Sequence, residues 1–236
     1  MAWQSPALNC ELKLDEISDF IRQHDAAFSG RLSGFHNYSR IVSLAHFVAL
    51  TEKLGLTNQA HTGVVSGYAN EPELHFLKSE KTTILNFDTD RSFDLDKSWA
   101  GSEPLNFSAT LCNQVLEHVF NPHVAFKNLI HHTRPNGHIY VTIPTINCIH
   151  GEPYFYSSGF HPRFLERIGL ENGLEVLNIG YWGSFKYMLN AVSGVWLTDR
   201  QLGIGAAAGI VQIPNVDGRV KQDQYITDCW GLFRKR

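Results

Sequence analysis

Apolar residues in the first part of the chain recur at the spacing of amphipathic helices. The two apolar stripes consist of Ile17, Phe20, Ile21 and Phe28, and of Ile41, Leu44, Ala45 and Val48. Apolar positions three and four residues apart share one helix face, which is then buried. Gly55 follows the second stripe, and glycine readily takes the left-handed backbone that ends many helices. We therefore predict a helical cap over residues 1–58, with a glycine-broken loop between its helices.

Beyond residue 59, apolar runs of strand length alternate with stretches of helical spacing. The predicted strands cover residues 62–65, 82–87, 107–112, 138–143, 174–181 and 226–233; the predicted helices cover residues 71–77 and 162–173, and a third begins at Pro122. Such alternation is typical of α/β folds with a parallel sheet. Ligands of these folds bind beyond the carboxyl ends of the strands.

The segment from Leu111 to Pro144 reads as a strand, a helix and a second strand. Asn121 followed by Pro122 is a helix start, because asparagine caps free N–H groups and proline lacks one. Pro135-Asn136-Gly137 predicts a turn, since Asn-Gly supplies positive φ angles. A site built on this unit would lie near residues 113–118 and 145–150, beyond the two strand ends.

Composition excludes several classes of function. The 236 residues are 43% hydrophobic, which suits one domain with additions, and the formal charge of -3 gives no basic footprint for nucleic acid. Cys10, Cys112, Cys148 and Cys229 show no paired spacing, so reduced thiols are expected. No apolar run approaches ~18 residues, and neither a membrane span nor a secretory signal is predicted. We expect a cytoplasmic protein.

The string VLEHVFNPHVAFKNLIHHTRPNGHIYVTIP, which ends at Pro144, resembles a segment of the class I S-adenosylmethionine-dependent methyltransferases, in particular the type 11-like family. There the segment reads as a Leu-Glu-His turn, a helix, an Arg-x-x-Lys-Pro-Gly-Gly turn and a strand that ends in Pro. The similarity extends more loosely over residues 60–183 and the end of the chain. It implies a Rossmann-like, doubly wound, mostly parallel seven-stranded sheet with an antiparallel last strand, and S-adenosylmethionine as cofactor.

The resemblance also implies a division of the chain. It separates the cap, residues 1–58, from a methyltransferase core, residues 59–183, an insertion, residues 184–224, and a last strand with its tail, residues 225–236. The family joins its last two strands by a short link, so the insertion is expected to be a lid or an interface, and a homodimer stays open. Gly203 to Gly209, within the insertion, matches a dinucleotide glycine pattern superficially, but no convincing strand precedes it.

The family binds its cofactor at a glycine turn after the first strand. The strand normally ends in an acidic residue, a spacer and Gly-x-Gly, so that the backbone passes close to the methionine part of the cofactor. This chain has Val65 in place of the acid, keeps Gly67, and has Ala69 for the second glycine, with Tyr68 between them as a further candidate for cofactor binding. Glu71 is a candidate for the missing charge, although the helix dipole also favours a glutamate there.

An acidic residue also ends the second predicted strand. Asp88 is suited to accept hydrogen bonds from both ribose hydroxyls of the cofactor. The resemblance assigns Asp94 and Leu95 to the adenine, and too few residues separate Asp88 from them for the usual helix, so we expect a loop or a short turn. Asn113, at the end of the third strand, faces the same crevice by topology.

Glu117-His118 raises the question of a metal. In the ubiquinone-pathway O-methyltransferases and the small-RNA 2′-O-methyltransferases, a Glu-x-x-Glu-His turn, joined in the latter by a later histidine, holds a divalent metal. The matching residues here are Gln114, Glu117, His118 and His150. Such a metal would lower the pKa of an acceptor hydroxyl. Glutamine is a poorer ligand than glutamate, so the sequence leaves a metal open.

His150 lies in a stretch that resembles the family's His-x-x-Pro-aromatic loop near the acceptor. It is the candidate general base, with Glu117 and His118 as further catalytic candidates. We expect an S-adenosylmethionine-dependent methyltransferase that methylates a hydroxyl of a small molecule or sugar by in-line transfer. The alternative, motivated by Val65 and Ala69, is a catalytically inactive methyltransferase-like protein with a binding or scaffolding role.

Overall fold

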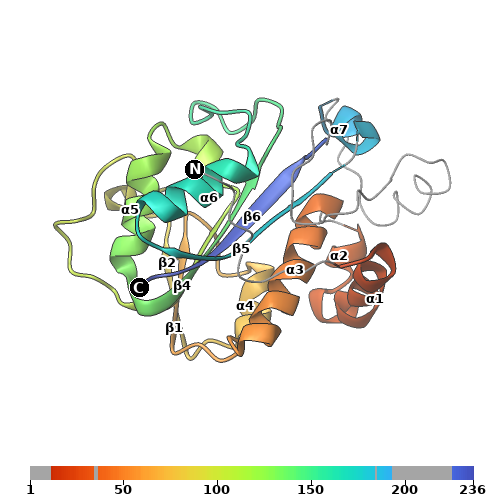
Figure 1. Ribbon diagram of the computed structural model, residues 1–236, viewed down its shortest axis with the longest axis horizontal. Coiled ribbons are helices and arrows are strands. Elements are labelled where there is room, and N and C mark those ends of the chain that lie inside the picture. The colour runs from red at the N-terminus through yellow and green to blue at the C-terminus, as the bar shows by residue number, and fades with distance from the viewer. Residues whose placement is uncertain (1–11, 35–36, 184, 193–224) are drawn as a thin grey trace.

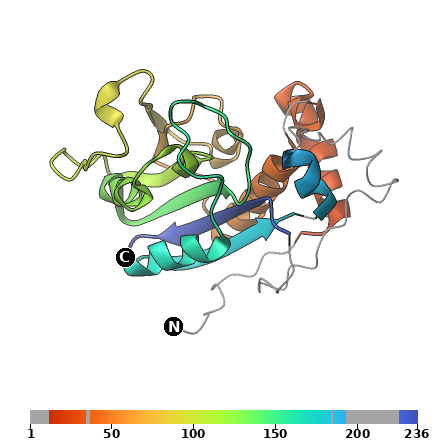
Figure 2. The ribbon, with the colours of Figure 1, turned by 90° about the horizontal axis from the view of Figure 1, so that it is seen from above.

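The fold is a mixed sheet with helices on both faces (Figures 1 and 2). The computed structural model describes residues 12–34, 37–183, 185–192 and 225–236. In this part of the chain, the sheet has six strands in the order β2-β1-β3-β4-β6-β5. The strands are β1 (His61–Val65), β2 (Lys81–Leu85), β3 (Phe107–Asn113), β4 (Thr133–Pro144), β5 (Glu175–Trp182) and β6 (Asp228–Arg234).

The direction of the strands follows the expected pattern. β1, β2, β3 and β4 pair in parallel, and β6 runs antiparallel to both β4 and β5. The Rossmann-like α/β class is therefore confirmed, including the antiparallel last strand. The expected number of seven strands is wrong for the described residues, because the chain between β2 and β3 forms only the short helical turn η2 (Arg91–Phe93).

Two hydrophobic cores lie on opposite faces of the sheet. The N-terminal helices are α1 (Leu14–His24), η1 (Asp25–Phe28), α2 (Arg31–Gly34) and α3 (Tyr38–Leu54). They pack with α4 (Pro72–Leu77) against side chains such as Tyr140, Trp182 and Trp230. The opposite core includes η3 (Leu116–His118), α5 (Pro122–His132) and α6 (Pro162–Glu171). The cap thus shares a core with the sheet.

The predicted helix ends are explained by local hydrogen bonds. The Asn37 side chain accepts a hydrogen bond from the Arg40 N–H at 2.9 Å at the start of α3, and Gly55 ends that helix with a φ of 67°. Asn121 caps α5 by accepting from the Val124 N–H at 3.3 Å. The caps expected from sequence at Gly55 and Asn121 are therefore confirmed.

The expected turn at residues 135–137 is an irregularity inside β4. Asn136 takes the predicted positive φ, 58°, but its N–H donates to the carbonyl of Lys235 at 2.8 Å, and the pairing with β3 shifts register between Phe107 and Ala109. A Cβ on Gly137 would lie 2.8 Å from the Phe107 carbonyl oxygen. The positive φ angle predicted from Asn-Gly is therefore present. The segment nevertheless stays in the sheet, because it pairs with β3 on one side and with the chain after β6 on the other.

The last helix described is α7 (Phe185–Val192). Most of the expected insertion, including the glycine pattern at residues 203–209, lies outside the described residues, so the assignment of a lid or interface stays a prediction. Among the described helices, none has the length and apolar character needed to cross a membrane.

Candidate functional site

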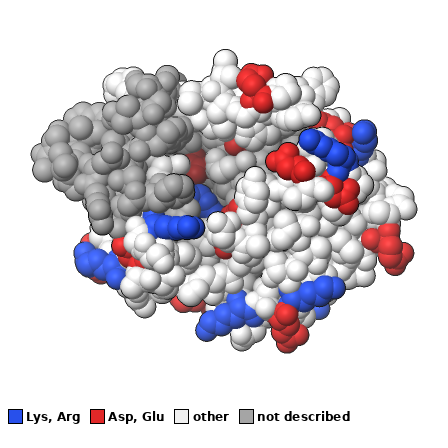
Figure 3. All heavy atoms as spheres, turned by 180° about the vertical axis from the view of Figure 1, so that it is seen from behind, with Lys and Arg blue, Asp and Glu red and all other residues white. Residues whose placement is uncertain are grey.

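Two cavities meet at the carboxyl edge of the parallel strands. The larger, of about 590 Å³, is lined by Ser66, Tyr68, Asn86, Phe87, Asp88, Phe93, Asp94, Leu95, Asp96, Gln114, Val115, His118, Val119, Gly151, Tyr154 and Tyr156. The smaller, of about 350 Å³, is lined by Asn37, Ser39, Arg40, Gln114, Glu117, Pro144, Asn147, Cys148, His150, Thr227 and Asp228. Gln114 lines both, so the cavities adjoin. Figure 3 shows a hollow on this molecule with acidic and basic atoms inside it.

The turn after β1 keeps one of the two usual glycines, Gly67, and is stabilised by hydrogen bonds from Ser66 and Asn86. Ser66 has a φ of 53°, and its N–H donates to the Leu85 carbonyl at 2.7 Å. The buried side chain of Asn86 donates to the Gly67 carbonyl at 3.0 Å. Of the predicted turn residues, Tyr68 lines the larger cavity, whereas Gly67 and Ala69 are not part of its wall.

Glu71 lies behind this turn in a buried ion cluster. The Arg40 guanidinium donates to both carboxylate oxygens of Glu73, at 2.5 and 2.6 Å, and to Glu71 at 3.2 Å. Asn113 also donates to Glu71, at 3.4 Å. Burial and the nearby Glu73 raise the pKa of Glu71, while Arg40 opposes this shift. The structure thus brings Glu71 and Asn113 together, with α3 supplying the cation.

Asp88 lies on the exposed rim of the larger cavity rather than directly at the end of β2. The first residue after β2 is the buried Asn86, whose side-chain oxygen accepts from the Asp88 N–H at 2.8 Å. Asp94 and Leu95 follow η2 and line the same cavity. The short connection expected between Asp88 and Asp94 is confirmed, and these three predicted cofactor residues share one cavity.

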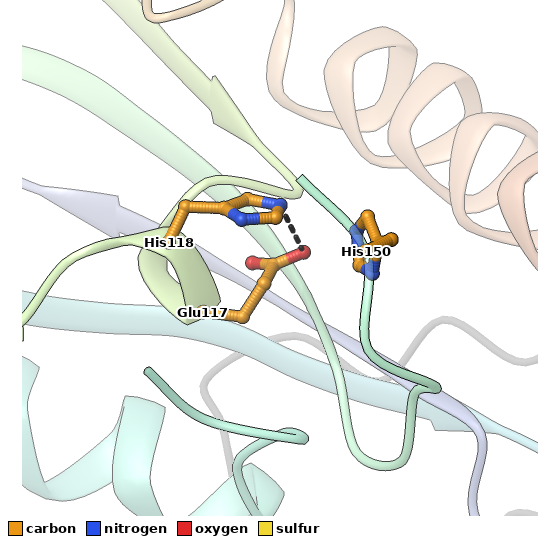
Figure 4. Close-up of side chains that lie close together, drawn as sticks. All are labelled: Glu117, His118 and His150. Atoms are coloured by element: carbon orange, nitrogen blue, oxygen red, sulfur yellow. Dashed lines mark ion pairs between the residues drawn. The ribbon is translucent and has the colours of Figure 1, made fainter. Parts of the chain in front are cut away.

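Glu117, His118 and His150 converge between the two cavities. Each offers one donor atom, and these atoms lie within 4.8 Å of one another. Figure 4 shows Glu117 and His118 on the turn η3, and His150 on the loop that follows β4. The His118 Nε2 atom is 3.8 Å from Oε1 of Glu117, and the two imidazole rings meet edge to face at 4.7 Å between centroids.

Backbone carbonyls fix the orientation of both imidazoles. Nδ1 of His118 lies 2.5 Å from the Tyr154 carbonyl oxygen, and Nδ1 of His150 lies 2.9 Å from that of Cys148. A carbonyl only accepts, so each Nδ1 carries the hydrogen and each Nε2 keeps a free lone pair in the neutral ring. Burial lowers the pKa of His118, which favours that neutral form.

Glu117 is a buried carboxyl that the described residues leave without a hydrogen bond. Its side chain is fully buried, and neither carboxylate oxygen has a hydrogen-bond partner among the described residues. Burial raises the pKa of Glu117 to about 7. Such a group is costly unless a proton, a cation or a ligand satisfies it, so it marks a functional position.

Gln114 is not part of this cluster. Its backbone has a φ of 54°, and its side-chain amide donates to Thr142 Oγ1 at 3.2 Å and to Asp228 Oδ1 at 3.1 Å. The structure therefore brings together three of the four predicted metal ligands and directs the fourth elsewhere.

Sequence reasoning missed Arg40, Asn86 and Asp228. Asp228 begins β6, which is antiparallel, so it reaches the edge where the parallel strands end, opposite Pro144 of β4. It is buried, and burial holds its pKa well above the usual range. A polar residue that starts an antiparallel strand of such a sheet is a signal that could have identified it.

Comparisons with known proteins give fold similarity at low sequence identity. No protein-family model matches the chain, and no curated protein matches its sequence. The [4+2]-cyclase SpnF is 15% identical, with 98% of this chain and 99% of that chain covered and a TM-score of 0.49.

Two further solved structures are methyltransferases with bound S-adenosylhomocysteine. The Burkholderia thailandensis 1,6-didemethyltoxoflavin-N1-methyltransferase is 10% identical over 98% of this chain and 93% of that chain, with a TM-score of 0.49. The N-methyltransferase NodS from Bradyrhizobium japonicum is 12% identical over 94% and 99%, with a TM-score of 0.47. The strand order of this chain identifies its fold as Rossmann-like. This is the fold that the resemblance to class I S-adenosylmethionine-dependent methyltransferases implies.

Proposed function

We propose that this protein is an S-adenosylmethionine-dependent methyltransferase that methylates a hydroxyl of a small polar molecule. The observation that carries the proposal is the meeting of two cavities at Gln114, on the sheet edge where this fold binds ligands. The larger cavity would hold the cofactor and the smaller one the acceptor. Methyl transfer needs this arrangement, because the nucleophile, the methyl carbon and the sulfur must lie in line.

The larger cavity offers groups suited to each part of the cofactor. The Asp88 carboxylate would accept hydrogen bonds from the ribose hydroxyls, as predicted from sequence. Asp94 and Leu95 would contact the adenine, together with the ring of Phe93. Tyr68, which lines this cavity, would face the methionine part, while Gly67 and Ala69 would shape the turn around it, with Glu71 behind the turn. Asn113 would act by holding Glu71.

His150 is the proposed general base. The acceptor oxygen would attack the methyl carbon as the carbon–sulfur bond breaks, and the hydroxyl proton would pass to Nε2 of His150. The Cys148 carbonyl holds the tautomer in which Nε2 is free, and His150 lines the acceptor cavity. The cavity itself contributes by aligning the reactants and excluding water.

The cluster of Glu117, His118 and His150 also fits a divalent cation. Two free imidazole nitrogens and an unpartnered buried carboxylate are a suitable donor set, and the carbonyls of Tyr154 and Cys148 fix the rings as outer hydrogen-bond partners do in metal sites. A cation bound there would supply Lewis acidity to the acceptor hydroxyl. His150 Nε2 cannot ligate a cation and accept a proton at once, so the two roles are separable by metal titration.

One observation favours the alternative of a protein without turnover. Val65 replaces the acid of the cofactor turn, and the nearest substitute, Glu71, is already bound to Arg40 and Asn113. A free carboxylate for the amino group of the cofactor is therefore missing from this position. A protein that binds a ligand in the acceptor cavity but not S-adenosylmethionine would fit this observation.

Calorimetric titration with S-adenosylhomocysteine separates the two functions. A methyltransferase should bind it with a Kd well below ~1 mM. Asp88→Ala should weaken binding about tenfold, since hydrogen bonds to a charged group are lost. Asp90→Ala is the matched control, because Asp90 is exposed nearby and does not line the cavity. Absence of binding by the unmodified protein would favour the protein without turnover.

A further inference from the structure

Most residues that line the smaller cavity carry a polar side chain. Apart from Pro144 and Cys148, the described residues that line it carry a polar or charged group. They come from separate parts of the fold: Ser39 from α3, Asn147 from the loop after β4, and Asp228 from the start of β6. The carbon atoms of these side chains make up most of the wall between the polar groups. Such a wall suits a ligand whose C–H and O–H groups alternate.

Aromatic side chains are concentrated in the other cavity. Tyr68, Phe87, Phe93, Tyr154 and Tyr156 all line the larger cavity, whereas no aromatic ring other than the His150 imidazole lines the smaller one in the described part of the chain. A flat phenolic or quinoid acceptor would find few apolar faces to stack on there. The aromatic residues that the sequence offers therefore do not argue for an aromatic acceptor.

Charge in this cavity also points to a ligand rich in hydrogen-bond donors. Arg40 forms ion pairs with Glu73 and Glu71. In the described structure it forms no direct ion pair with Asp228. Asp228 is buried, and its Oδ1 atom accepts a hydrogen bond from the Gln114 side chain. On the same wall, Glu117 is buried with no hydrogen-bond partner in the described part of the chain. Buried carboxyls require hydrogen-bond donors, and hydroxyl groups of a ligand supply them.

We propose that the acceptor is a small polyhydroxylated molecule of the sugar or cyclitol type, and that Asp228 selects it by accepting a hydrogen bond from one of its hydroxyls. That this molecule accepts a methyl group rests on the proposed function, whereas its binding in the smaller cavity does not. Asp228 is then a specificity residue, because a ligand without a hydroxyl at this position cannot donate a hydrogen bond to the carboxyl.

Saturation-transfer NMR on the protein with S-adenosylhomocysteine tests the proposal, with myo-inositol, phenol and ethanolamine as probes. We expect saturation transfer to myo-inositol but not to phenol or ethanolamine. The Asp228→Asn variant should bind myo-inositol at least tenfold more weakly than the unmodified protein. Asn147→Ala, in a loop, should weaken it severalfold without risk to the sheet. Glu103→Gln is the matched control, since Glu103 is exposed far from the cavity wall, and it should change nothing.

Several results would overturn the proposal. The proposal is wrong if myo-inositol shows no saturation transfer, or if phenol displaces it. It is also wrong if the protein prefers ethanolamine and Asp228→Asn abolishes that binding, or if Asp228→Asn and Asn147→Ala both bind myo-inositol as the unmodified protein does. Unchanged S-adenosylhomocysteine affinity in Asp228→Asn would show that the variant is folded. Failure to bind S-adenosylhomocysteine would sink the methyltransferase function alone, because myo-inositol binding can be measured without it.

Discussion

His118 Nε2 lies 3.8 Å from Oε1 of Glu117, a carboxylate that is fully buried and has no hydrogen-bond partner among the described residues. Contact of a free imidazole lone pair with an unsatisfied carboxyl is unfavourable unless a proton or a cation lies between them. The pKa of Glu117, raised by burial to about 7, allows a proton to be held there near neutral pH. The Glu117 carboxyl can therefore hold a proton, or release it when a cation binds between Glu117 and His118.

Metal titration should distinguish these states. Cobalt(II) added to the metal-free protein is expected to give a visible absorption band that saturates, and zinc should displace it. His118→Ala and His150→Ala should each weaken binding at least tenfold, because each removes one of three donors. His123→Ala, an exposed histidine on α5, is the control and should bind as the unmodified protein does. Absence of a saturable band would leave His150 as the base.

The buried ion cluster should be important for stability. Arg40→Met would leave Glu73 buried without its cation, which we expect to lower the free energy of unfolding by about 3–5 kcal/mol. Arg167→Ala removes an exposed ion pair with Glu171 on α6 and should cost only about 0.5 kcal/mol. Urea denaturation of both variants measures the difference. Equal losses would contradict the assigned role of Arg40.

Gly180 should tolerate no side chain. A Cβ added there would lie 2.1 Å from Nε1 of Trp230 on the neighbouring strand β6, and both residues are packed inside the sheet. Gly180→Ala should therefore destabilise the protein by about 1–3 kcal/mol through overpacking. Gly101→Ala is the control, since no atom lies within 4 Å of its added Cβ. Thermal unfolding of both variants checks this, and equal melting temperatures would contradict the packing of Trp230.

Stability should fall in mild acid because of His46. Burial lowers the pKa of His46 to about 4 in the folded protein, from 6.5. Its Nδ1 atom donates to the Val42 carbonyl and its Nε2 accepts from the Leu12 N–H, which a second proton would prevent. Between pH 6.5 and pH 4, the unfolded chain binds a proton at His46 that the folded chain does not bind. The free energy of unfolding therefore decreases as the pH decreases, by about 3 kcal/mol over the whole interval.

Urea denaturation at pH 7 and pH 5 measures this effect. The unmodified protein should lose stability between the two values, and His46→Leu should lose less over the same interval. An equally steep loss in His46→Leu would show that another group is responsible.

Sequence predicted the elements whose signals are local. The apolar stripe that contains Ile41 and the caps at Gly55 and Asn121 depend on residues a few positions apart, and each predicted element exists. The sheet class followed from alternation of strands and helices. The local pattern predicted six strands, as the described residues have, and only the family resemblance implied a seventh. The kink inside β4 depends on pairing between distant segments, such as Asn136 with Lys235, which local patterns do not encode.

The site was predicted where its residues follow strand ends in order. Glu117 and His118 lie beyond β3 and His150 beyond β4, so the topology brings them together. Arg40 was not predicted because it reaches the site from the cap, and Asp228 was not because its strand runs in the opposite direction. Contributions of this kind depend on the packing of whole elements, and a single sequence gives no distance for them.

A crystal structure of the protein with S-adenosylhomocysteine tests the central claim most directly. The account predicts the adenosine in the larger cavity, with the ribose hydroxyls at Asp88 and the adenine near Asp94 and Leu95, and the sulfur pointing toward Gln114 and the smaller cavity. Clear density elsewhere, or a ligand-free cavity at saturating concentration, would contradict the claim that this chain is a methyltransferase.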